Sequence, residues 1–471
     1  MSIKILGKES LIYGGGHVVS RSITFLLLPI YTNVFSLGDY GIISLIYTFL
    51  GFMNVILHYG LDASLLKHYV PADNEGRKSF LTNAYASFIL TTIGFIILMI
   101  FFRNHISELL FGSNLPQIIF LVSGILFFDV LWAIHILLLR AEEKPILFTI
   151  INLYNVLSSL GLNLFLVLYL KLGIYGVLFS NIITSGCIFL FTFPLILKRI
   201  SILSLSVQTW KKLMKFGYPF LFAGIFSMVL EFSDRYILLY LTNIETVGLY
   251  NAGYKLGMLM MLVVMGFNMA WQPYFLKKDK MEKIYITQTT TLVVSLLGFL
   301  WILLLLWSDN LVQIQFGETS FFGKEYWSSI QIVPIIALAY IFHALYLLQL
   351  PGLYLLEKSG WIAWIRCIGA FSNIILNFLF IPEYGIIGAA SATCLSFFLM
   401  ATIFYLINRK IFPISYSWRK LGIISFTTGL IFIIQANIPL DIPIKIMVCI
   451  SYPIVIIITG VIKIKQIRTI F

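Results

Sequence analysis

The stretch YTNVFSLGDYGIISLIYTFLGF, residues 31–52, contains the pattern that decides the fold. It holds the end of one apolar segment, a short polar turn, and Gly41, which opens the next apolar segment. The same pattern returns in LYLTNIETVGLYNAGYKLGML, residues 239–259, where Gly248 corresponds to Gly41 at an offset of 207 residues. The sequence therefore predicts that the chain contains an internal repeat.

A second pair of segments supports this repeat. LNLFLVLYLKLGIYG (162–176) resembles LNFLFIPEYGIIG (376–388), with a gap of two residues inside the aligned stretch. The corresponding positions are Asn163 and Asn377, Gly173 and Gly385, and Gly176 and Gly388. Two pairs with offsets near 210 predict two halves of six spans each. Because six is even, both halves enter the membrane from the same side, which predicts a central site between halves related by an axis along the membrane normal.

The composition indicates a membrane protein. Of the 471 residues, 60% are apolar and 11% are charged, and the mean hydropathy is +0.96. Soluble domains carry about 25% charged residues, so the composition excludes a cytosolic enzyme, a disordered protein and a nucleic-acid binder. A spanning helix needs about 20 mostly apolar residues, and fourteen of them would use about 280 residues.

Apolar runs between charged or turn-forming breaks predict fourteen spans. They are 11–35, 42–66, 79–102, 117–139, 146–170, 174–197, 217–241, 248–274, 285–307, 328–352, 361–381, 386–407, 421–437 and 443–462. The fold class expected is an all-α polytopic membrane protein. We expect two six-helix bundles around a central cavity, followed by two additional helices.

The lysines and arginines predict the orientation. Of the 32 in the chain, 24 fall in the predicted loops on the side of the N-terminus and four fall on the opposite side. Cytoplasmic loops carry such an excess, so both termini are expected in the cytoplasm. The net charge of +12 then reflects topology and not a nucleic-acid partner. The four remaining cations lie inside predicted spans.

Four segments resemble the polysaccharide-exporting flippases of the multidrug/oligosaccharidyl-lipid/polysaccharide (MOP) transporter superfamily. They are LLLPIYTNVFSLGDYGIISL (26–45), YGLDASLLKHY (59–69), SDRYILLYLTNIETVGLYNAGYKL (233–256) and FIPEYGIIGAASAT (380–393). The resemblance implies two six-helix bundles that face a central cavity. In the related lipid II flippases, the two added helices help to form a groove for the lipid tail. Together with the repeat, it predicts an N-terminal lobe (1–200), a cytoplasmic linker (201–216), a C-terminal lobe (217–410) and two additional helices (411–471).

The cations inside the predicted spans are the candidate substrate ligands: Arg21, Lys255, Arg235 and Arg366. A charge at the bilayer centre is costly, so such residues usually face a cavity or a partner. Arg21 and Lys255 have no carboxylate three or four residues away. For Arg235, a local ion pair with Glu231 or Asp234 is an equal alternative, and for Arg366 the alternative is snorkelling to the interface.

Carboxylates inside or beside the spans are the candidates for ion coupling: Asp62, Asp129, Glu231 and Asp234. Each could carry a proton or a sodium ion, or could instead pair with a neighbouring cation. No metal-ligand spacing or nucleotide motif occurs, and the four cysteines are interpreted as packing residues. We therefore expect no cofactor and no metal.

The functional hypothesis is a flippase that moves a polyprenyl-pyrophosphate-linked oligosaccharide across the bacterial inner membrane by alternating access. Its expected partners are the lipid-linked oligosaccharide, the membrane and other polysaccharide assembly proteins, with no nucleic acid. The first alternative is a multidrug efflux antiporter of the same fold, although four buried cations would repel cationic drugs. The second is a membrane glycosyltransferase or glycan polymerase, although the longest outer loop, about 308–327, offers few catalytic groups.

Overall fold

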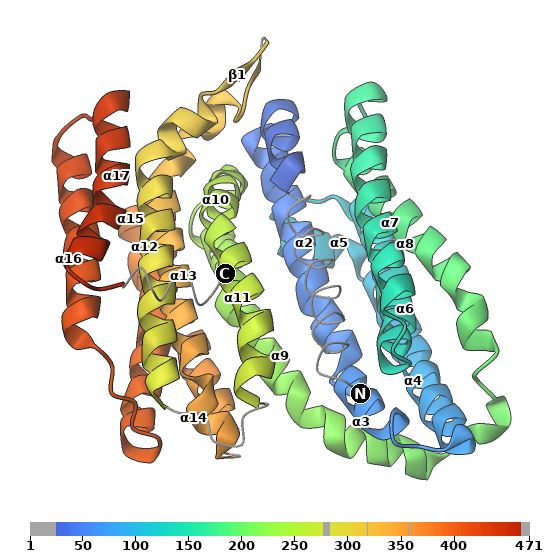
Figure 1. The fold of residues 1–471 in the computed structure, drawn as a ribbon. Helices are drawn as coiled ribbons and strands as arrows, with labels where there is room; N and C mark the ends of the chain where they lie inside the picture. Colours follow the sequence, from blue (N-terminus) through green and yellow to red (C-terminus); the bar gives the residue numbers. More distant parts are fainter. Residues whose placement is uncertain (1–24, 277–282, 318, 357, 359, 463–471) are drawn as a thin grey trace. The chain divides into compact units, whose positions relative to one another are not determined.

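The fold is known from a computed structural model, which describes residues 25–276, 283–317, 319–356, 358 and 360–462. The chain divides into two compact units, Met1–Gly248 (unit 1) and Leu249–Phe471 (unit 2). Each unit consists of long helices, and the described chain contains β-structure only as one short hairpin (Figure 1). This is the all-α polytopic membrane fold that the sequence predicts.

The first described element of unit 1 is the apolar helix Phe25–Val34. The elements that follow are α2 (Leu37–His58), α3 (Leu61–Tyr69), α4 (Asn74–Phe101), α5 (Arg103–Phe111), α6 (Pro116–Ala141), α7 (Pro145–Asn163), the π-helix η1 (Leu164–Tyr169), α8 (Gly173–Leu197), the 3-10 helix η2 (Ile202–Ser204), α9 (Val207–Leu241) and the first turn of α10 (Ile244–Gly257). Side chains cap several of these helices: Ser36, Asp73 and Ser206 accept hydrogen bonds from the backbone N–H groups of Asp39, Gly76 and Thr209.

Unit 2 continues α10. Its other elements are α11 (Leu259–Leu276), α12 (Lys283–Val312), β1 (Gln315–Phe316), β2 (Thr319–Ser320), the 3-10 helix η3 (Lys324–Ile332), α13 (Val333–Leu348), α14 (Leu350–Leu355), α15 (Gly360–Ile411), α16 (Trp418–Asn437) and α17 (Ile442–Ile458). The two strands are antiparallel, with Gln315 opposite Ser320 and Phe316 opposite Thr319. This hairpin lies in the predicted outer loop 308–327.

The described residues contain ten helices that are long and apolar enough to cross a membrane, or eleven if the bent pair α10 and α11 forms one span. α15 is 52 residues long and merges two predicted spans across a kink at Gly385, where φ is +53°. Phe25–Val34 and α17 are apolar but shorter. The count of fourteen spans stays a prediction.

The linker predicted at 201–216 is largely helical, because α9 starts at Val207 and runs to Leu241. α9 packs against α2, α3 and α4 within unit 1. Gly217 of α9 approaches so close to Gly60 that a Cβ on Gly60 would lie 2.0 Å from the Gly217 oxygen. The proposed lobe boundaries themselves stay a prediction.

The repeated glycines occupy equivalent structural positions. Gly173 and Gly385 both have a positive φ, of +57° and +53°. A Cβ on Gly176 would meet the Leu166 oxygen at 3.1 Å, and one on Gly388 would meet the Phe380 oxygen at 2.4 Å. Leu166 and Phe380 are 214 residues apart, which is the glycine offset of 212 plus the gap of two residues seen in the sequence.

The first glycine pair makes a reciprocal contact. A Cβ on Gly41 would lie 2.2 Å from the Ile244 oxygen, and one on Gly248 would lie 2.0 Å from the Leu37 oxygen. Residues 37 and 244 are themselves related by the offset of 207. The first turns of α2 and α10 therefore touch backbone to backbone, as small residues allow between membrane helices.

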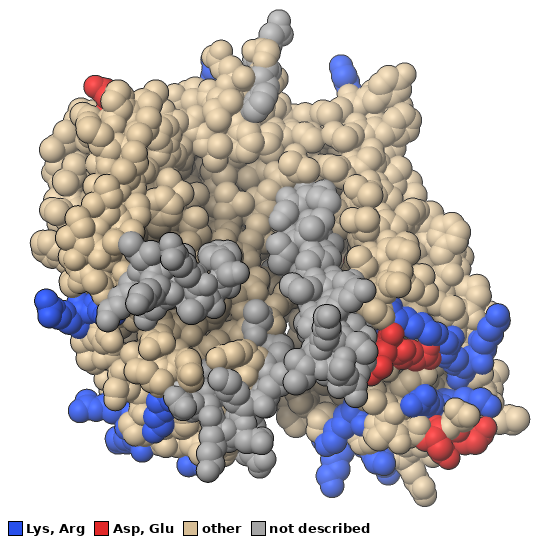
Figure 2. Space-filling model, in the orientation of Figure 1, with Lys and Arg blue, Asp and Glu red and all other residues tan. Residues whose placement is uncertain are grey.

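Basic side chains gather at one end of each unit (Figure 2). In unit 1 they belong to α3, the start of α4, the end of α6 and its connection to α7, the end of α8, and the start of α9. The exposed ones there are Lys67, Lys78, Arg140, Lys144, Lys198, Lys211, Lys212 and Lys215. In unit 2 the exposed ones at this end include Lys283, Lys358, Arg409, Lys410 and Arg419. This clustering is the pattern from which the sequence predicts the cytoplasmic side.

Candidate functional site

Three of the four candidate cations lie in the described part of the chain. Arg21 falls in residues 1–24, outside the described residues. Lys255 is half-buried on α10. The preceding residue, Tyr254, is buried and forms a hydrogen-bonded pair with Tyr340 of α13, with 3.0 Å between the hydroxyl oxygens. Packing of α10 on α13 through this pair fixes the position of Lys255 within unit 2.

Arg366 lies on α15, half-buried, and contacts the aromatic groups of α13. Its Nε donates to the Tyr346 hydroxyl at 3.3 Å. Its charge also acts on His343, one turn earlier on α13, whose ring stacks on Phe397 at 4.8 Å between centroids. The His343 Nδ1 is buried and has no hydrogen-bond partner among the described residues. Arginine, tyrosine and histidine thus converge at one place, and a guanidinium fork suits phosphate oxygens.

Arg235 has a different environment. It is 3% exposed on α9, and its Nη1 lies 2.6 Å from the Asp234 Oδ1. The same Nη1 donates to the backbone oxygen of Glu231 at 2.8 Å. The Arg235 guanidinium also lies over the ring of Phe232, 5.1 Å from its centroid. The local ion pair considered from the sequence is therefore present, and Asp234 compensates the charge of Arg235.

Asp129, on α6, lies in a polar cluster inside unit 1. Its carboxylate accepts hydrogen bonds from the Ser185 hydroxyl of α8 and, at 3.1 Å, from the Trp132 indole. The Tyr47 hydroxyl is near enough to interact electrostatically with it, and it accepts a hydrogen bond from the Asn181 amide at 2.7 Å. Hydroxyl, indole and amide groups from α2, α6 and α8 therefore surround one carboxylate.

A second polar network lies deeper in unit 1. The Tyr31 hydroxyl donates to the Asn163 Oδ1 at 2.7 Å, and the Asn163 Nδ2 donates to the Ser180 hydroxyl at 2.7 Å. In unit 2 the equivalent Asn377 donates to the Asn373 backbone oxygen at 2.8 Å and to its Oδ1 at 2.9 Å. The sequence comparison found both asparagines but not their partners: Tyr31 is 132 residues from Asn163, whereas Asn373 is four residues from Asn377 on the same helix.

Two further acidic candidates lie on α3 and α9. Asp62 is exposed on α3, and Glu231 is half-buried on α9. Among the described residues, no group of three or more histidine, cysteine, aspartate or glutamate side chains could hold a metal ion. All four cysteines are free thiols. Asp129 is the candidate acid whose hydroxyl and indole donors are described above.

Comparisons with known proteins agree with this architecture. A family model described as "Polysaccharide biosynthesis protein" matches residues 6–278. The "Putative O-antigen transporter" of Shigella flexneri is 22% identical over 369 residues, which cover 74% of this chain and 85% of the relative. An identity this low does not by itself assign the chain to a family, so the assignment rests on the family model.

Solved structures with the same fold include transporters. The structure "Lipid II flippase MurJ, inward closed conformation" has a TM-score of 0.73 and 17% identity, covering 94% of this chain and 98% of the other. An inward-facing multidrug resistance MATE family transporter of the MOP superfamily has a TM-score of 0.68 and 12% identity, covering 83% and 94%. Likeness at these identities shows the fold, and the fold is one used for transport.

Proposed function

The chain belongs to the polysaccharide biosynthesis protein family, the polysaccharide flippases of the MOP superfamily, and on this premise we propose that it moves a polyprenyl-pyrophosphate-linked oligosaccharide across the bacterial inner membrane. The substrate passes from the cytoplasmic leaflet to the outer leaflet for surface polysaccharide synthesis. Both termini lie in the cytoplasm in this proposal. Other polysaccharide assembly proteins are expected as partners, and the chain itself performs no chemical reaction.

The observation that carries the proposal is the placement of cations inside apolar helices of unit 2. Arg366 sits among Tyr346 and His343, and Lys255 is held half-buried by the packing of α10 on α13. A pyrophosphate offers these groups the charge-assisted contacts that phosphate oxygens make with arginine and lysine. Arg21, from outside the described residues, belongs to the same proposed set. Arg235 has the smallest share in it, because Asp234 already compensates its charge.

Asp129 is the proposed coupling group. A carboxylate inside a helix bundle is expensive unless it has partners, and such residues mark proton or ion pathways. Ser185 and Trp132 give Asp129 two of the donors that a carboxylate needs, and Tyr47 interacts with it electrostatically. Asp62, Glu231 and Asp234 stay lesser candidates for coupling to a proton or a sodium ion.

The test is glycan export by charge-removing variants. Arg21→Ala and Lys255→Ala should each abolish or strongly reduce export, since a charge-assisted contact contributes about 1.5–3 kcal/mol, roughly a 10- to 150-fold change in affinity. Arg366→Ala should reduce export less if its side chain snorkels towards the interface. Arg21→Lys keeps the charge without the fork and should fall between the native chain and Arg21→Ala.

The measurement is surface glycan per unit of membrane-inserted protein in a strain lacking the native gene. Arg140→Ala and Lys198→Ala are matched controls, because both side chains are exposed at helix ends. Export at the native level by both Arg21→Ala and Lys255→Ala would refute the pyrophosphate site. Drug efflux by the native chain without glycan export would favour the antiporter.

A further inference from the structure

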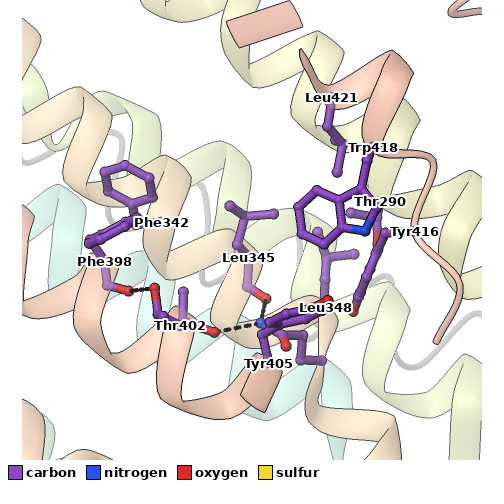
Figure 3. A pocket seen from close by; sticks show the side chains of 12 residues that line it. Thr290, Phe342, Leu345, Leu348, Phe398, Thr402, Tyr405, Tyr416, Trp418 and Leu421 are labelled. Atoms are coloured by element: carbon purple, nitrogen blue, oxygen red, sulfur yellow. Dashed lines mark hydrogen bonds between the residues drawn. The ribbon is translucent and has the colours of Figure 1, made fainter. Parts of the chain in front are cut away.

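A cavity of about 250 Å³ lies inside unit 2, between α12, α13, α15 and the start of α16 (Figure 3). Its walls are mostly apolar, with Phe342, Leu345, Phe398 and Leu421 among the lining residues. Thr402 also lines it, and its hydroxyl donates to the Phe398 oxygen of its own helix. The lining is therefore suited to a hydrocarbon chain.

Two buried polar atoms on this lining have no hydrogen-bond partner among the described residues. They are the side-chain oxygen of Gln349 and the hydroxyl of Tyr416. The amide nitrogen of Gln349 donates to the backbone oxygens of Leu345 and Ala401 at 3.0 and 3.1 Å. The side-chain oxygen of Gln349 is then left to accept a hydrogen bond. Buried polar groups in native proteins are almost always paired, so these two atoms point to a ligand that carries polar groups.

The Tyr416 hydroxyl is also a reliable donor. Tyr416 lies in the connection between α15 and α16, outside the helices. Burial, with a further contribution from Tyr405, raises the pKa of Tyr416, so that its hydroxyl keeps the proton. The ligand must therefore present an acceptor to Tyr416 and a donor to Gln349, next to an apolar chain.

The surroundings of the cavity place it at the membrane interface. Tyr405, Tyr416 and Trp418 form an aromatic cluster at one side, with ring centroids 5.3 to 6.0 Å apart. Tyrosine and tryptophan concentrate at the level of lipid headgroups. Exposed Arg409, one turn beyond Tyr405, and exposed Arg419, next to Trp418, add positive charge on the same flank. Such cations attract anionic lipids.

We propose that this cavity holds one acyl chain of an anionic glycerophospholipid of the bilayer. The phosphate lies towards the basic flank, an ester oxygen accepts from Tyr416, and a headgroup hydroxyl donates to Gln349. A glycerophospholipid has ester groups directly between phosphate and hydrocarbon, which supply the acceptor for Tyr416, and a glycerol headgroup has the hydroxyl that Gln349 requires. A polyprenyl chain has no polar atom below its pyrophosphate, so it leaves both side chains without partners.

The first test uses phosphatidylglycerol and phosphatidylcholine as probes on the purified full-length chain. Native mass spectrometry should find phosphatidylglycerol retained by the native chain at detergent concentrations that remove phosphatidylcholine. Thr402→Phe fills the cavity and should lose the bound lipid. Thr427→Phe is the matched control, because Thr427 makes the same bond to its own helix, on α16 and away from the cavity lining. Equal retention by both variants would overturn the proposal, as would retention of polyprenyl phosphate in preference to phosphatidylglycerol.

The second test separates a ligand contact from a structural role. Without lipid, Tyr416→Phe removes an unpaired buried hydroxyl and should leave the melting temperature unchanged or raise it. With phosphatidylglycerol, the same variant should bind about 2- to 12-fold more weakly, the value of one hydrogen bond. Arg409→Gln with Arg419→Gln should lower the preference for phosphatidylglycerol over phosphatidylcholine. A lipid response equal to that of the native chain in both variants would refute the proposed contacts.

Discussion

Arg235 and Arg199 of unit 1 and Arg366 of unit 2 contact different kinds of side chain. In unit 1, Arg235 pairs with Asp234, and Arg199 donates to both oxygens of Glu142, from Nε at 2.7 Å and from Nη2 at 2.8 Å. In unit 2, Arg366 donates to the phenol of Tyr346 and lies near His343. A carboxylate cancels the charge of its partner, whereas a phenol only orients it. The two arginines of unit 1 thus form ion pairs with carboxylates, whereas Arg366 of unit 2 contacts the aromatic groups of α13.

The backbones of the repeats do not share this difference. Gly176 and Gly388 each permit a close approach to the chain that precedes them, and Gly173 and Gly385 share a positive φ. Similar turns thus carry different polar side chains. The two units therefore differ in their polar side chains and share the backbone turns that carry them.

The largest effect is expected at the buried pair of unit 1. Arg235→Gln leaves Asp234 buried without its partner, and breaking a buried ion pair costs about 3–5 kcal/mol. The variant should show a much lower melting temperature in detergent. Arg366→Gln is the matched change in unit 2 and should keep the native melting temperature while binding a pyrophosphate probe such as farnesyl pyrophosphate more weakly. The reverse outcome, a stable Arg235→Gln and an unstable Arg366→Gln, would break the comparison.

The shared glycines should respond unequally. A Cβ at Gly388 would lie 2.4 Å from the Phe380 backbone oxygen, whereas one at Gly176 would lie 3.1 Å from the Leu166 oxygen. Gly388→Ala should therefore destabilise the chain by about 1–3 kcal/mol, as overpacking does, and Gly176→Ala by less. Thermal unfolding of the two variants measures the difference. Equal melting temperatures would contradict this prediction and would show that the backbone around Gly388 moves aside more easily than the backbone around Gly176.

The smallest effect is expected at Glu142, which lies just beyond the end of α6. Burial acts to raise the pKa of this carboxyl, but hydrogen bonds from Lys144 and Arg199 outweigh it and hold the pKa below its usual range. The resulting stability is present above the ordinary glutamate pKa of about 4.3 and is lost as the pH falls through the lowered value. Arg199→Gln should cost about 1 kcal/mol at neutral pH.

The pH profile provides the control for this last variant. The difference in melting temperature between the native chain and Arg199→Gln should shrink as the pH falls from the ordinary glutamate pKa of about 4.3 through the lowered value, because Glu142 then becomes protonated in both. Glycan export at neutral pH should stay near the native level, since the pair lies outside the proposed substrate site. A difference that grows in acid would contradict the role given to Glu142.

The sequence predicted the fold because helices in a bilayer leave a strong local record. Apolar runs and glycine-bounded turns identify spans. The offsets near 210 identify the repeat, in which Gly176 and Gly388 occupy corresponding positions in the structure. The pairing of Arg235 with Asp234 was also foreseeable, because the two residues are adjacent. The π-helix after α7 was not, since the predicted span 146–170 runs through it and its form depends on how neighbouring helices pack.

The polar contacts of the site were mostly beyond reach of the sequence. Asp129 and Ser185 are 56 residues apart, and Tyr31 and Asn163 are 132 residues apart. No local pattern records that such residues meet, because the meeting is decided by helix rotation. Sequence could nominate Asp129 as a costly charge inside a span, but not supply its donors.

The reciprocal contact between Gly41 and Gly248 constrains which amino-acid changes the chain can accept. For each glycine the nearest atom of the other segment is a backbone oxygen, that of Ile244 for Gly41 and that of Leu37 for Gly248. A second mutation can shorten a side chain that clashes, but it cannot remove a carbonyl. A substitution at Gly41 therefore cannot be compensated by a substitution at Gly248, or the reverse. Each glycine is therefore required by the main chain of the opposite repeat. The two segments contact each other through corresponding positions, as the two copies do at the interface of a symmetric dimer.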